Sequence, residues 1–563
     1  MQGKIKFVSH PWINPNAIEA RSYQDAIVRT ALSGNTLCVL PTGLGKTSIA
    51  ALVAAERLHH AFEAQKKKSN RSQADFMPAD SIPSVCDSKV LFLAPTRPLV
   101  AQHKRSFERF MKIGPDEIAA VTGAMKPIDR KRAYQHADIV ISTPQTTQND
   151  LKNGILNLSP FNLLIVDEAH RSVGNYAYVF IAKRYIEEAK DPLILALTAS
   201  PGASRAKIEQ IKNALSIKNV SIRSREDEDV KPYVQKVQNI WVEVDLPQAL
   251  HAACEGFARL RQSCIDRLHS LGLEELGIRL PAKLAKKQIL MLHASLSKRK
   301  HWKSFAAMSI LAELLKLDHA LLLLETQSLY SFERYIARLR DDESKATMRL
   351  LANAMFNAAV NAIVELSANG MENPKLSRLK GIVKAELDRH HHIIIFTQYR
   401  DTVDRIMQVL KEIPGANPAA FIGQASKARR RDRACGEPAE CGGVTSRGMS
   451  QKEQLQIIKD FRSGFYNILV ATSIGEEGLD IEETDAVIFY EPIPSEIRSI
   501  QRSGRTGRTR PGKVIVLIAK NTRDQAFYWS AYHKQKKMTR LLQGMQAKNA
   551  SLDPFIEGEN DVR

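Results

Sequence analysis

The 563-residue chain has few cysteines and no long apolar runs, and both absences exclude whole classes of protein. Six scattered cysteines are too few to staple a chain of this length with disulfides. Only Cys435 and Cys441 lie close together, and without a second ligand pair they are better explained by a loop than by a zinc site. No run of about 18 uncharged apolar residues is present, and the opening MQGKIKFVSHPWINP lacks the apolar core of a secretory signal. We therefore expect a cytoplasmic, nucleoid-associated protein with no membrane partner.

Acidic residues are also in deficit. The chain has 61 Asp and Glu against 81 Lys and Arg, which gives a formal net charge of +20. Such a surplus favours a polyanionic partner, although charge alone leaves open a protein that is basic only for solubility. At about 150 residues per domain, the length predicts roughly three to four domains.

Two parts of the chain alternate short apolar runs with helical patterns. The runs are TLCVL, VLFLAP, DIVIST, LLIVDEAH and LILALTAS between residues 36 and 200, and HIIIFTQYR, NILVATS, DAVIFYEP and GKVIVLIAK after residue 376. Such runs are typical of buried parallel strands, and their polar or Gly/Pro ends are where α/β sheets place ligand-binding loops. No repeat of solenoid period is found.

The part between these two α/β blocks is rich in Leu, Ala, Lys and Arg, with apolar residues at three- and four-residue spacing, and predicts an all-helical insertion. Its Lys-rich stretch at 281–304 is either a solvated helix face or a nucleic-acid contact surface, with Trp302 available for stacking. The predicted organisation is an α/β protein with two parallel-sheet domains and this insertion, divided as 1–225, 226–375, 376–535 and a basic then acidic tail at 536–563, partly disordered.

The segment LPTGLGKT lies between an apolar run and a helical pattern, an order that is typical of a phosphate-binding loop. Gly43 and Gly45 would let backbone amides close around phosphate oxygens. Lys46 would neutralise the terminal phosphates, and the Thr47 hydroxyl would ligate magnesium. The usual pattern begins with Gly, and an ordinary glycine turn is the alternative. The residues predicted to bind nucleotide here are Leu40, Pro41, Thr42, Gly43, Leu44, Gly45, Lys46 and Thr47.

The run LLIVDEAH follows about 120 residues later and ends in two carboxylates. Phosphoryl transfer needs a carboxylate that holds magnesium, usually through water, and another that orients the attacking water. We assign these roles to Asp167 and Glu168. A strand that merely ends in an acidic turn is the alternative.

The segment QRSGRTGR at 501–508 carries three arginines that would repel one another unless they faced anions. Arg505 and Arg508 are predicted to stabilise the charge on the transferring phosphoryl group from the opposite domain, which makes hydrolysis conditional on domain closure. The alternative is a solvated basic loop.

Several further loops follow apolar runs. In LTAS at 197–200, Thr198 and Ser200 are predicted to link the nucleotide state to the partner domain, although an ordinary turn explains them equally well. Loops of this kind also present amides and hydroxyls to phosphates, a grip that does not depend on sequence. The residues predicted to contact nucleic acid are Arg97, Thr122, Gly123, Thr143 and Thr472.

In this order, LPTGLGKT, DEAH, LTAS and QRSGRTGR resemble the signature of superfamily 2 helicases, and the resemblance covers both α/β blocks. The chain is most similar to the family of the archaeal Hef helicase and the Fanconi anaemia M translocase, and less similar to the Dicer-type and innate-immune RNA helicases. The resemblance implies two RecA-like domains, ATP and Mg²⁺ as cofactors, and hydrolysis that drives movement. Hef also has a nuclease domain, but no nuclease motif follows residue 520.

The resemblance adds roles for five residues that the sequence pattern alone does not give. It places the Gln24 amide at the adenine, framed by Arg21 and Tyr23. It also makes Gln501 face the nucleotide and puts Asp480 near the ribose.

Three functions remain open. The helical insertion matches the Hef-like arrangement and favours a motor for branched or forked DNA in repair or at replication forks. A Dicer-like RNA helicase is the second hypothesis. A non-catalytic nucleic-acid scaffold is the third, and the intact Lys46, Asp167, Glu168 and Arg508 disfavour it. No pattern indicates protein partners.

Overall fold

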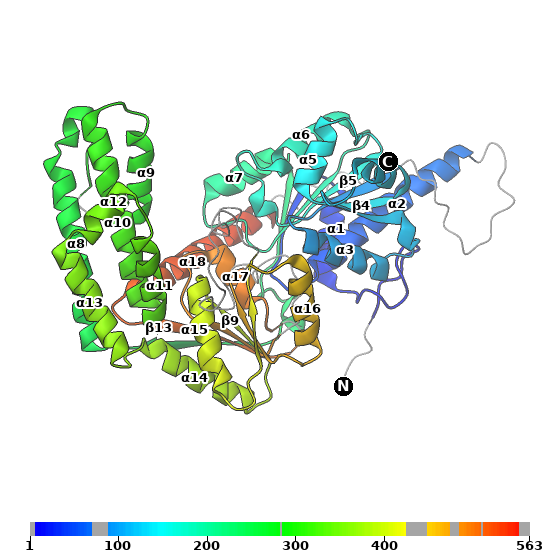
Figure 1. The fold of residues 1–563 in the computed structure, drawn as a ribbon. Helices are drawn as coiled ribbons and strands as arrows, with labels where there is room; N and C mark the ends of the chain where they lie inside the picture. The colour runs from blue at the N-terminus through cyan, green and yellow to red at the C-terminus, as the bar shows by residue number, and fades with distance from the viewer. Residues whose placement is uncertain are drawn as a thin grey trace.

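The computed structural model describes residues 6–69, 88–281, 284–423, 448–472, 484–507 and 510–550. Figure 1 shows two sheet-containing domains and a helical domain that stands beside the second of them. The predicted fold class, two parallel-sheet domains with an all-helical domain inserted in the chain between them, is confirmed.

The first domain contains a seven-stranded sheet in the order β3-β4-β2-β5-β6-β1-β7, in which neighbouring strands run parallel. Its central strands are buried on both faces, as the continuous apolar runs predicted. The strands are β1 (Thr36–Val39), β2 (Lys89–Leu93), β3 (Ile118–Val121), β4 (Ile139–Ser142), β5 (Phe161–Val166), β6 (Ile194–Thr198) and β7 (Asn219–Ile222).

Helices cover both faces of this sheet. One core contains side chains of α1, α2 and α3, and the core on the other face contains side chains of α4, α5, α6 and α7. The helices are α1 (Ser22–Leu32), α2 (Lys46–Ser69), α3 (Arg97–Phe110), α4 (Pro127–His136), α5 (Pro144–Lys152), α6 (Ala177–Glu188) and α7 (Arg205–Ala214). Prolines in the first turn of α3, α4 and α5 fix where these helices begin, directly after the strand-end loops.

The second domain contains a six-stranded parallel sheet in the order β10-β11-β9-β12-β13-β8. Its strands are β8 (Val237–Val244), β9 (Ile393–Phe396), β10 (Pro418–Phe421), β11 (Ile468–Ala471), β12 (Ala486–Phe489) and β13 (Gly512–Ala519), and its helices are α14 (Pro374–Leu387), α15 (Arg400–Lys411), α16 (Gln451–Arg462) and α17 (Glu496–Ser503). The edge strand β8 precedes the helical domain in sequence. The sheet therefore begins inside the range 226–375 that the sequence assigned to the insertion.

The helical domain comprises α8 (Gln248–Ser270), α9 (Lys286–Leu296), α10 (Trp302–Thr326), α11 (Leu329–Arg340), α12 (Lys345–Leu351) and α13 (Ala354–Ala368). It has its own apolar core, in which the Phe257 ring meets the rings of Phe332 and Phe356 edge-on. Within the described residues no single helix has the length and apolar character of a membrane span. In that part of the chain, α12 and α13 together have the length and apolar composition of a span, but they are bent by 70° at the break between them.

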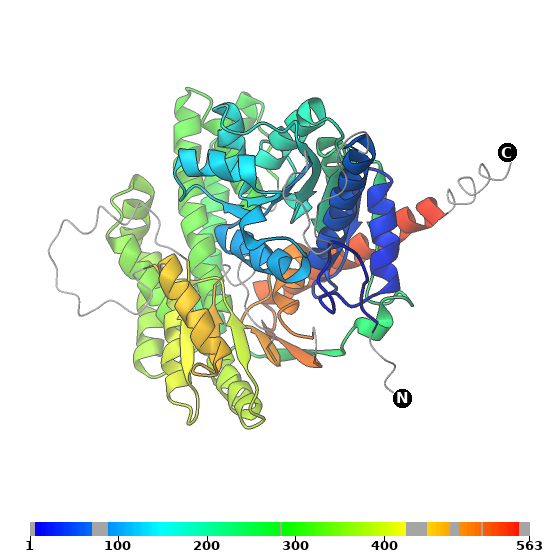
Figure 2. The same ribbon diagram turned by 90° about the vertical axis from the view of Figure 1, so that its right-hand side faces the viewer.

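The last described helix, α18 (Arg523–Ala550), contacts all three domains. At its start, the Arg523 guanidinium donates to the Asp318 carbonyl of α10 at 2.7 Å. Further along, Met538 and Leu542 are buried in the core of the first domain, and Figure 2 shows that end of the helix beside the first domain. Residues 536–550 therefore continue a helix and do not form the separate tail expected from sequence, because two apolar side chains four residues apart share one buried face.

A buried ion pair joins three elements where the helical and second domains meet. Lys375, at the start of α14, places its Nζ 2.6 Å from Asp524 Oδ2 of α18, and both side chains are fully buried. The same Nζ donates to the Thr326 carbonyl at the end of α10 at 2.9 Å and lies 4.9 Å from the centre of the Tyr490 ring. This lysine therefore ties α10, α14 and α18 together.

Candidate functional site

The predicted phosphate loop connects β1 to α2 at the carboxyl edge of the first sheet. Gly43 and Gly45 have φ values of 85° and 84°, which side-chain-bearing residues rarely adopt. A Cβ atom at Gly45 would also lie 2.5 Å from Gln24 Nε2, so this position has no room for a side chain. Since α2 begins at Lys46, its unpaired amides face the loop.

Apolar residues anchor the loop and leave its polar residues accessible. Leu40 and Leu44 are buried, whereas Pro41, Thr42, Lys46 and Thr47 are partly exposed and Gly43 is exposed. The Lys46 ammonium donates to the Leu40 carbonyl at 3.1 Å. Within the described residues this carbonyl is the one hydrogen-bond partner of the Lys46 ammonium, which can therefore turn toward a phosphate. The loop already has the curved backbone that phosphate binding needs.

Gln24 lies under this loop, on α1. Its Nε2 donates to the Leu44 carbonyl at 3.2 Å, and the Tyr23 hydroxyl donates to the same oxygen at 2.9 Å. Gln24 Oε1 is buried and accepts no hydrogen bond within the described part of the chain. Arg21 donates to the Tyr23 hydroxyl at 3.1 Å and stacks over the Tyr233 ring, 4.6 Å from its centre. A buried acceptor beside a phosphate loop, framed by Arg21 and two tyrosines, suits a base that has an amino group.

Asp167 and Glu168 follow β5, the strand beside β2 and β6. Asp167 is buried, and its Oδ2 lies 3.1 Å from His103 Nε2 of α3. Burial alone would raise the pKa of Asp167. The hydrogen bond and charge of His103, and then the charge of Lys46, outweigh burial and hold that pKa below its usual value. The carboxylate is therefore ionised at neutral pH and suited to a cation.

Glu168 adopts the left-handed conformation, with φ of 49°, and its Oε2 lies 3.2 Å from His170 Nδ1. A residue other than glycine in this conformation is uncommon and is often found at functional sites. The DEAH turn thus sends the two carboxylates in different directions, Asp167 toward α3 and Glu168 toward the histidine of the same motif.

The hydroxyls of LTAS form a compact turn at the end of β6. Thr198 Oγ1 donates to the Ser200 carbonyl and accepts from the Ser200 amide, both at 3.1 Å. The Ser200 hydroxyl donates to Met538 Sδ of α18 at 2.9 Å. The predicted link between nucleotide state and partner domain stays a prediction, and the contact found here is to α18.

The two sheet domains meet at the phosphate loop. A Cβ atom built on Gly504, just after α17, would lie 2.1 Å from Thr42 Oγ1. Nearby, the Ala203 amide donates to Glu496 Oε1 at 3.3 Å, and Ile500 packs against the core of the first domain. The nucleotide loop of one domain and the arginine segment of the other therefore form opposite walls of one seam.

The arginines of QRSGRTGR do not all face this seam. Arg502 is fully buried, and its guanidinium lies 4.9 Å from the Phe396 ring centre and 5.9 Å from that of Phe489. Arg502 is not among the predicted phosphate contacts, and its planar cation packs on aromatic rings. Gln501 and Arg505 are also buried and lie on either side of Gly504.

Four predicted positions, Asp480, Arg508, Cys435 and Cys441, lie outside the described residues. Among the residues that are described, no three His, Cys, Asp or Glu side chains converge as a metal cluster. A magnesium ion held by Thr47, Asp167 and phosphate oxygens needs no such cluster.

Burial raises the pKa of the Cys38 thiol to about 12, as expected for a cysteine that packs as a small apolar residue.

Three loops predicted to contact nucleic acid converge in the first domain. A Cβ atom built on Gly123 would lie 3.7 Å from an Arg97 guanidinium nitrogen and 3.5 Å from Thr146 Oγ1. Thr143 Oγ1 is 2.8 Å from that same Thr146 hydroxyl. The partly exposed Thr122 directly precedes Gly123. These loops therefore form one polar edge.

An ion pair fixes the shape of this edge. Arg130 of α4 makes two hydrogen bonds to the buried carboxylate of Asp150 on α5, at 2.8 and 2.6 Å, and a third to the Met125 carbonyl at 2.6 Å.

Thr472 lies at the end of β11 in the other sheet, where its amide donates to the Phe421 carbonyl at 3.1 Å. It belongs to the second domain and does not join the cluster around Arg97.

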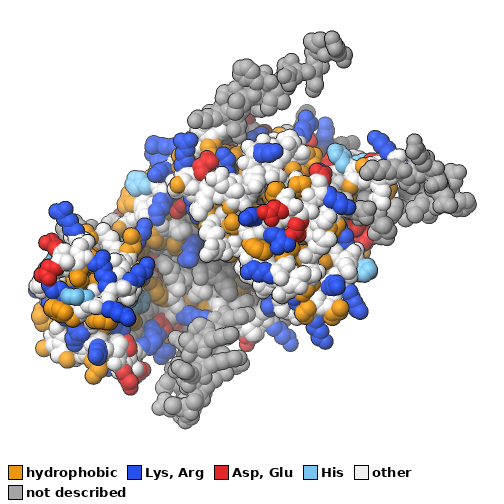
Figure 3. All heavy atoms as spheres, turned by 90° about the horizontal axis from the view of Figure 1, so that it is seen from above, with side chains coloured by type: hydrophobic (Ala, Val, Ile, Leu, Met, Phe, Trp, Pro, Cys, Tyr) orange, Lys and Arg blue, Asp and Glu red, His pale blue; other side chains and the backbone are white. Residues whose placement is uncertain are grey.

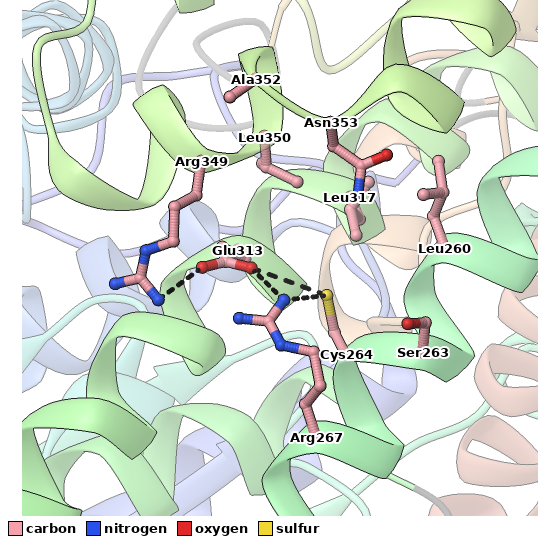
Figure 4. A pocket seen from close by; sticks show the side chains of 10 residues that line it. All are labelled: Leu260, Ser263, Cys264, Arg267, Glu313, Leu317, Arg349, Leu350, Ala352 and Asn353. Atoms are coloured by element: carbon pink, nitrogen blue, oxygen red, sulfur yellow. Dashed lines mark hydrogen bonds and ion pairs between the residues drawn. The ribbon is translucent and has the colours of Figure 1, made fainter.

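Away from the seam, the helical domain encloses a pocket of about 230 Å³ between α8, α10 and α12. Figure 4 shows Arg267 and Arg349 pointing from two helices at the carboxylate of Glu313. The buried Glu313 pairs with them at 2.9 and 3.3 Å, beside Cys264. These paired charges hold the three helices together, so we assign the pocket a structural role.

Sequence reasoning missed two side chains that shape the cleft, His103 and Tyr233. His103 occupies one of the buried positions of α3, where its spacing looks like that of a core residue, and Tyr233 comes from the segment after β7. Neither belongs to a motif, and only the fold brings them to Asp167 and Arg21.

Three domain families match the chain. "DEAD/DEAH box helicase" matches residues 21–208, "Helicase conserved C-terminal domain" matches 374–510, and "Putative ATP-dependent RNA helicase, helical bundle" matches 258–370. These ranges fall on the first domain, the second domain and the helical domain.

Similar full-length proteins occur in archaea and eukaryotes. A Methanocaldococcus jannaschii protein named "Putative ATP-dependent RNA helicase MJ1505" is 39% identical over 541 residues, which cover 96% of this chain and 63% of the relative. "ATP-dependent DNA helicase MPH1" of Coccidioides immitis is 31% identical over 94% of this chain and 47% of its own length. "Fanconi anemia group M protein homolog" of Mus musculus is 29% identical over 95% of this chain and 27% of its own. The chain thus spans less than two thirds of each of these relatives.

One solved structure is similar over nearly its whole length. The crystal structure of the Pyrococcus furiosus Hef helicase domain is 38% identical, with a TM-score of 0.63, and the match covers 91% of this chain and 98% of that domain. The motifs, the arrangement of the three domains and this match agree: the chain belongs to the superfamily 2 helicases of the Hef type.

Proposed function

We propose that the chain is a nucleic-acid-dependent ATPase that moves along DNA and acts on branched or forked DNA. The observation that carries the proposal is the seam at which Thr42 of the phosphate loop meets Gly504 of the arginine segment. A nucleotide gripped from both walls can link its hydrolysis to the relative movement of two domains.

The described side chains fit ATP and magnesium. Gln24 offers its buried acceptor to the adenine amino group, and Lys46 and the free amides of α2 suit the phosphates. Thr47 and the ionised Asp167 would hold the magnesium ion, which when bound neutralises charge on the phosphates. Glu168 would orient the attacking water, and Gln501, Arg505 and Arg508 would complete the site from the second domain, with Asp480 near the ribose.

The polar edge around Arg97 suits a phosphate backbone. Arg97 is exposed and lies beside Gly123, while Thr122 and Thr143 add hydroxyls and Thr472 would add a contact from the second domain. Contacts of this kind do not read bases, as a motor that moves along any sequence requires. Figure 3 shows Lys and Arg side chains scattered over the visible face of the first and helical domains, in keeping with a polyanionic substrate.

DNA is the favoured substrate because fungal relatives are named DNA helicases. In the helical domain Trp302 is 65% exposed, with the Lys303 ammonium 5.7 Å from its ring centre, and such a side chain is suited to stacking on an unpaired base. An RNA helicase is the second candidate, because the M. jannaschii relative carries that name.

The test is ATP turnover with forked DNA, duplex DNA, duplex RNA or no nucleic acid. We expect the largest stimulation with forked DNA, and no turnover in a Glu168→Gln control that still binds the same fork. Stronger stimulation by duplex RNA would favour the RNA helicase. Binding without any turnover would favour a scaffold.

A further inference from the structure

A histidine links the helix behind the nucleic-acid edge to the carboxylate of the ATP site. His103 lies on α3, and its Nε2 is 3.1 Å from Asp167 Oδ2. Its ring packs on Phe92 of β2, with 4.4 Å between the ring centres. His103 is therefore fixed by β2 on one side and by Asp167 on the other.

The position of His103 is unusual for a polar residue. The buried side chains of α3 are Val100, His103, Phe107 and Phe110, which form one stripe against the core. A leucine would suit such a stripe equally well for packing. Within the described residues, Asp167 is the one hydrogen-bond partner of the His103 ring, so the histidine is best explained by that carboxylate.

The other end of α3 lies at the nucleic-acid edge. Thr96 caps the helix, its hydroxyl accepting from the Leu99 amide at 3.4 Å, and Arg97 begins it beside Gly123. At 1.5 Å per residue, His103 lies about 9 Å along the helix from Arg97. A helix moves as a rigid body over that distance, so a shift at Arg97 moves His103 with it.

We propose that His103 is a positioning residue that couples nucleic-acid binding to the magnesium site. A phosphate drawn against Arg97 and the first turn of α3 fixes the helix, and the helix fixes His103. His103 in turn holds the Asp167 carboxylate in the orientation needed for the cation. This inference rests on the proposed function, because it needs a nucleic-acid-stimulated ATPase in which Asp167 serves magnesium.

The test compares His103→Leu and His103→Gln with the wild-type full chain. Leucine keeps the packing and removes the hydrogen bond, whereas glutamine can still donate to Asp167. The matched control is Lys104→Ala on the same helix, since Lys104 is partly exposed and pairs with Glu108 at 3.6 Å, its one ion-pair partner in the described part of the chain. Melting temperatures establish that each variant is folded.

Two readouts are used. The first is ATP turnover at saturating Mg²⁺ with and without forked DNA. His103→Leu should lower the ratio of stimulated to basal turnover by about tenfold, with basal turnover much less affected. The second is Mn²⁺ binding in the presence of ADP, followed by electron paramagnetic resonance, which should weaken by about tenfold or more. His103→Gln should recover most of the stimulation ratio and most of the Mn²⁺ affinity, and Lys104→Ala should match the wild type in both.

A wild-type stimulation ratio and Mn²⁺ affinity in His103→Leu would overturn the proposal. Equal losses of basal and stimulated turnover, with Mn²⁺ affinity kept, would also overturn it and leave His103 a core residue. If the wild-type chain itself shows no stimulation, the proposed function fails first, and the two failures are thus distinguished.

Discussion

The two sheet domains share a fold but use their buried charges differently. In the first domain, the buried carboxylate of Asp167 lies at the carboxyl edge of the sheet, with Lys46 near it and His103 as its partner. In the second, Arg502 stacks on two phenyl rings, and Lys375 is paired with Asp524 inside the protein.

The difference shows which charges are available for chemistry. Taking a charge out of water is costly, so a buried charge persists only with a partner. A buried charge whose partner lies inside the protein, such as that of Lys375, stabilises the fold. Under the proposed function a bound ligand would supply further partners to Asp167, which leaves its carboxylate available. If this distinction holds, variants of Asp167 and its neighbours in the site lose function, and variants of Lys375 lose stability.

The largest expected effect is the loss of ATP hydrolysis in Lys46→Ala. Removing the ammonium leaves the terminal phosphates without their cation from this wall, and turnover should fall by about 10³-fold or more. Binding of forked DNA and the melting temperature should change little, because the polar edge around Arg97 is elsewhere. Turnover near the wild-type rate would remove the phosphate loop from the site.

The second expected effect is a loss of stability in Lys375→Met. This change leaves Asp524 buried without its cation and should lower the free energy of unfolding by about 3–5 kcal/mol, measured by denaturant titration. The control is Lys380→Ala on the same helix, whose exposed pair with Glu412 should contribute about 0–1 kcal/mol. An equal, small effect of both variants would break the comparison between the domains.

A smaller effect is expected for Gln24→Ala. Loss of the buried acceptor should raise the KM for ATP by about tenfold, or about 1.4 kcal/mol, with kcat changing less, because the amide acts on the base and not on the reacting phosphate. The control is Gln262→Ala, which replaces an exposed glutamine on α8 whose side chain donates to Asp266. An unchanged KM would show that the base binds elsewhere.

The smallest effect concerns a buried carboxylate at the opposite edge of the first sheet. Burial, with help from Glu117 and against the opposing charge of Lys89, raises the pKa of Asp138 to about 7. The folded state then holds a proton that the unfolded state releases at lower pH. The stability from this group is complete below the ordinary aspartate pKa and is lost as pH rises through about 7.

Asp138→Asn should remove that dependence. Relative to the wild type, the variant should gain on the order of 1–2 kcal/mol between about pH 5 and about pH 8, read from melting temperatures of both proteins at each pH. Turnover should be unaffected at either pH. A constant difference between the two proteins would contradict the raised pKa.

The first domain was the more predictable half of the molecule. Its phosphate loop and DEAH turn are local: each strand, turn and helix start is written in consecutive residues, and the glycine φ values and the position of Asp167 follow from them. The order of the strands, by contrast, depends on pairing between distant segments.

What could not be predicted depends on contacts between distant segments. β8 has an alternating exposed pattern, typical of an edge strand, and only its pairing with β13 shows that it belongs to the second sheet. In the sequence, Arg502 cannot be distinguished from its neighbours Arg505 and Arg508. The rings of Phe396 and Phe489 that pack against it come from other segments of the chain. The helix beyond residue 535 likewise depends on a partner in the first domain.

The central claim is that the phosphate loop and the arginine segment form the two walls of one catalytic cleft, and Gly504→Ala tests it most directly. The backbone at Gly504 has φ of −71°, which alanine adopts readily, so the variant should fold, and its new methyl group should meet Thr42 Oγ1. Measured at saturating ATP, Mg²⁺ and forked DNA, turnover should fall by about tenfold or more with an unchanged melting temperature. Full turnover in Gly504→Ala would show that these walls do not close on each other during hydrolysis, and would contradict the account.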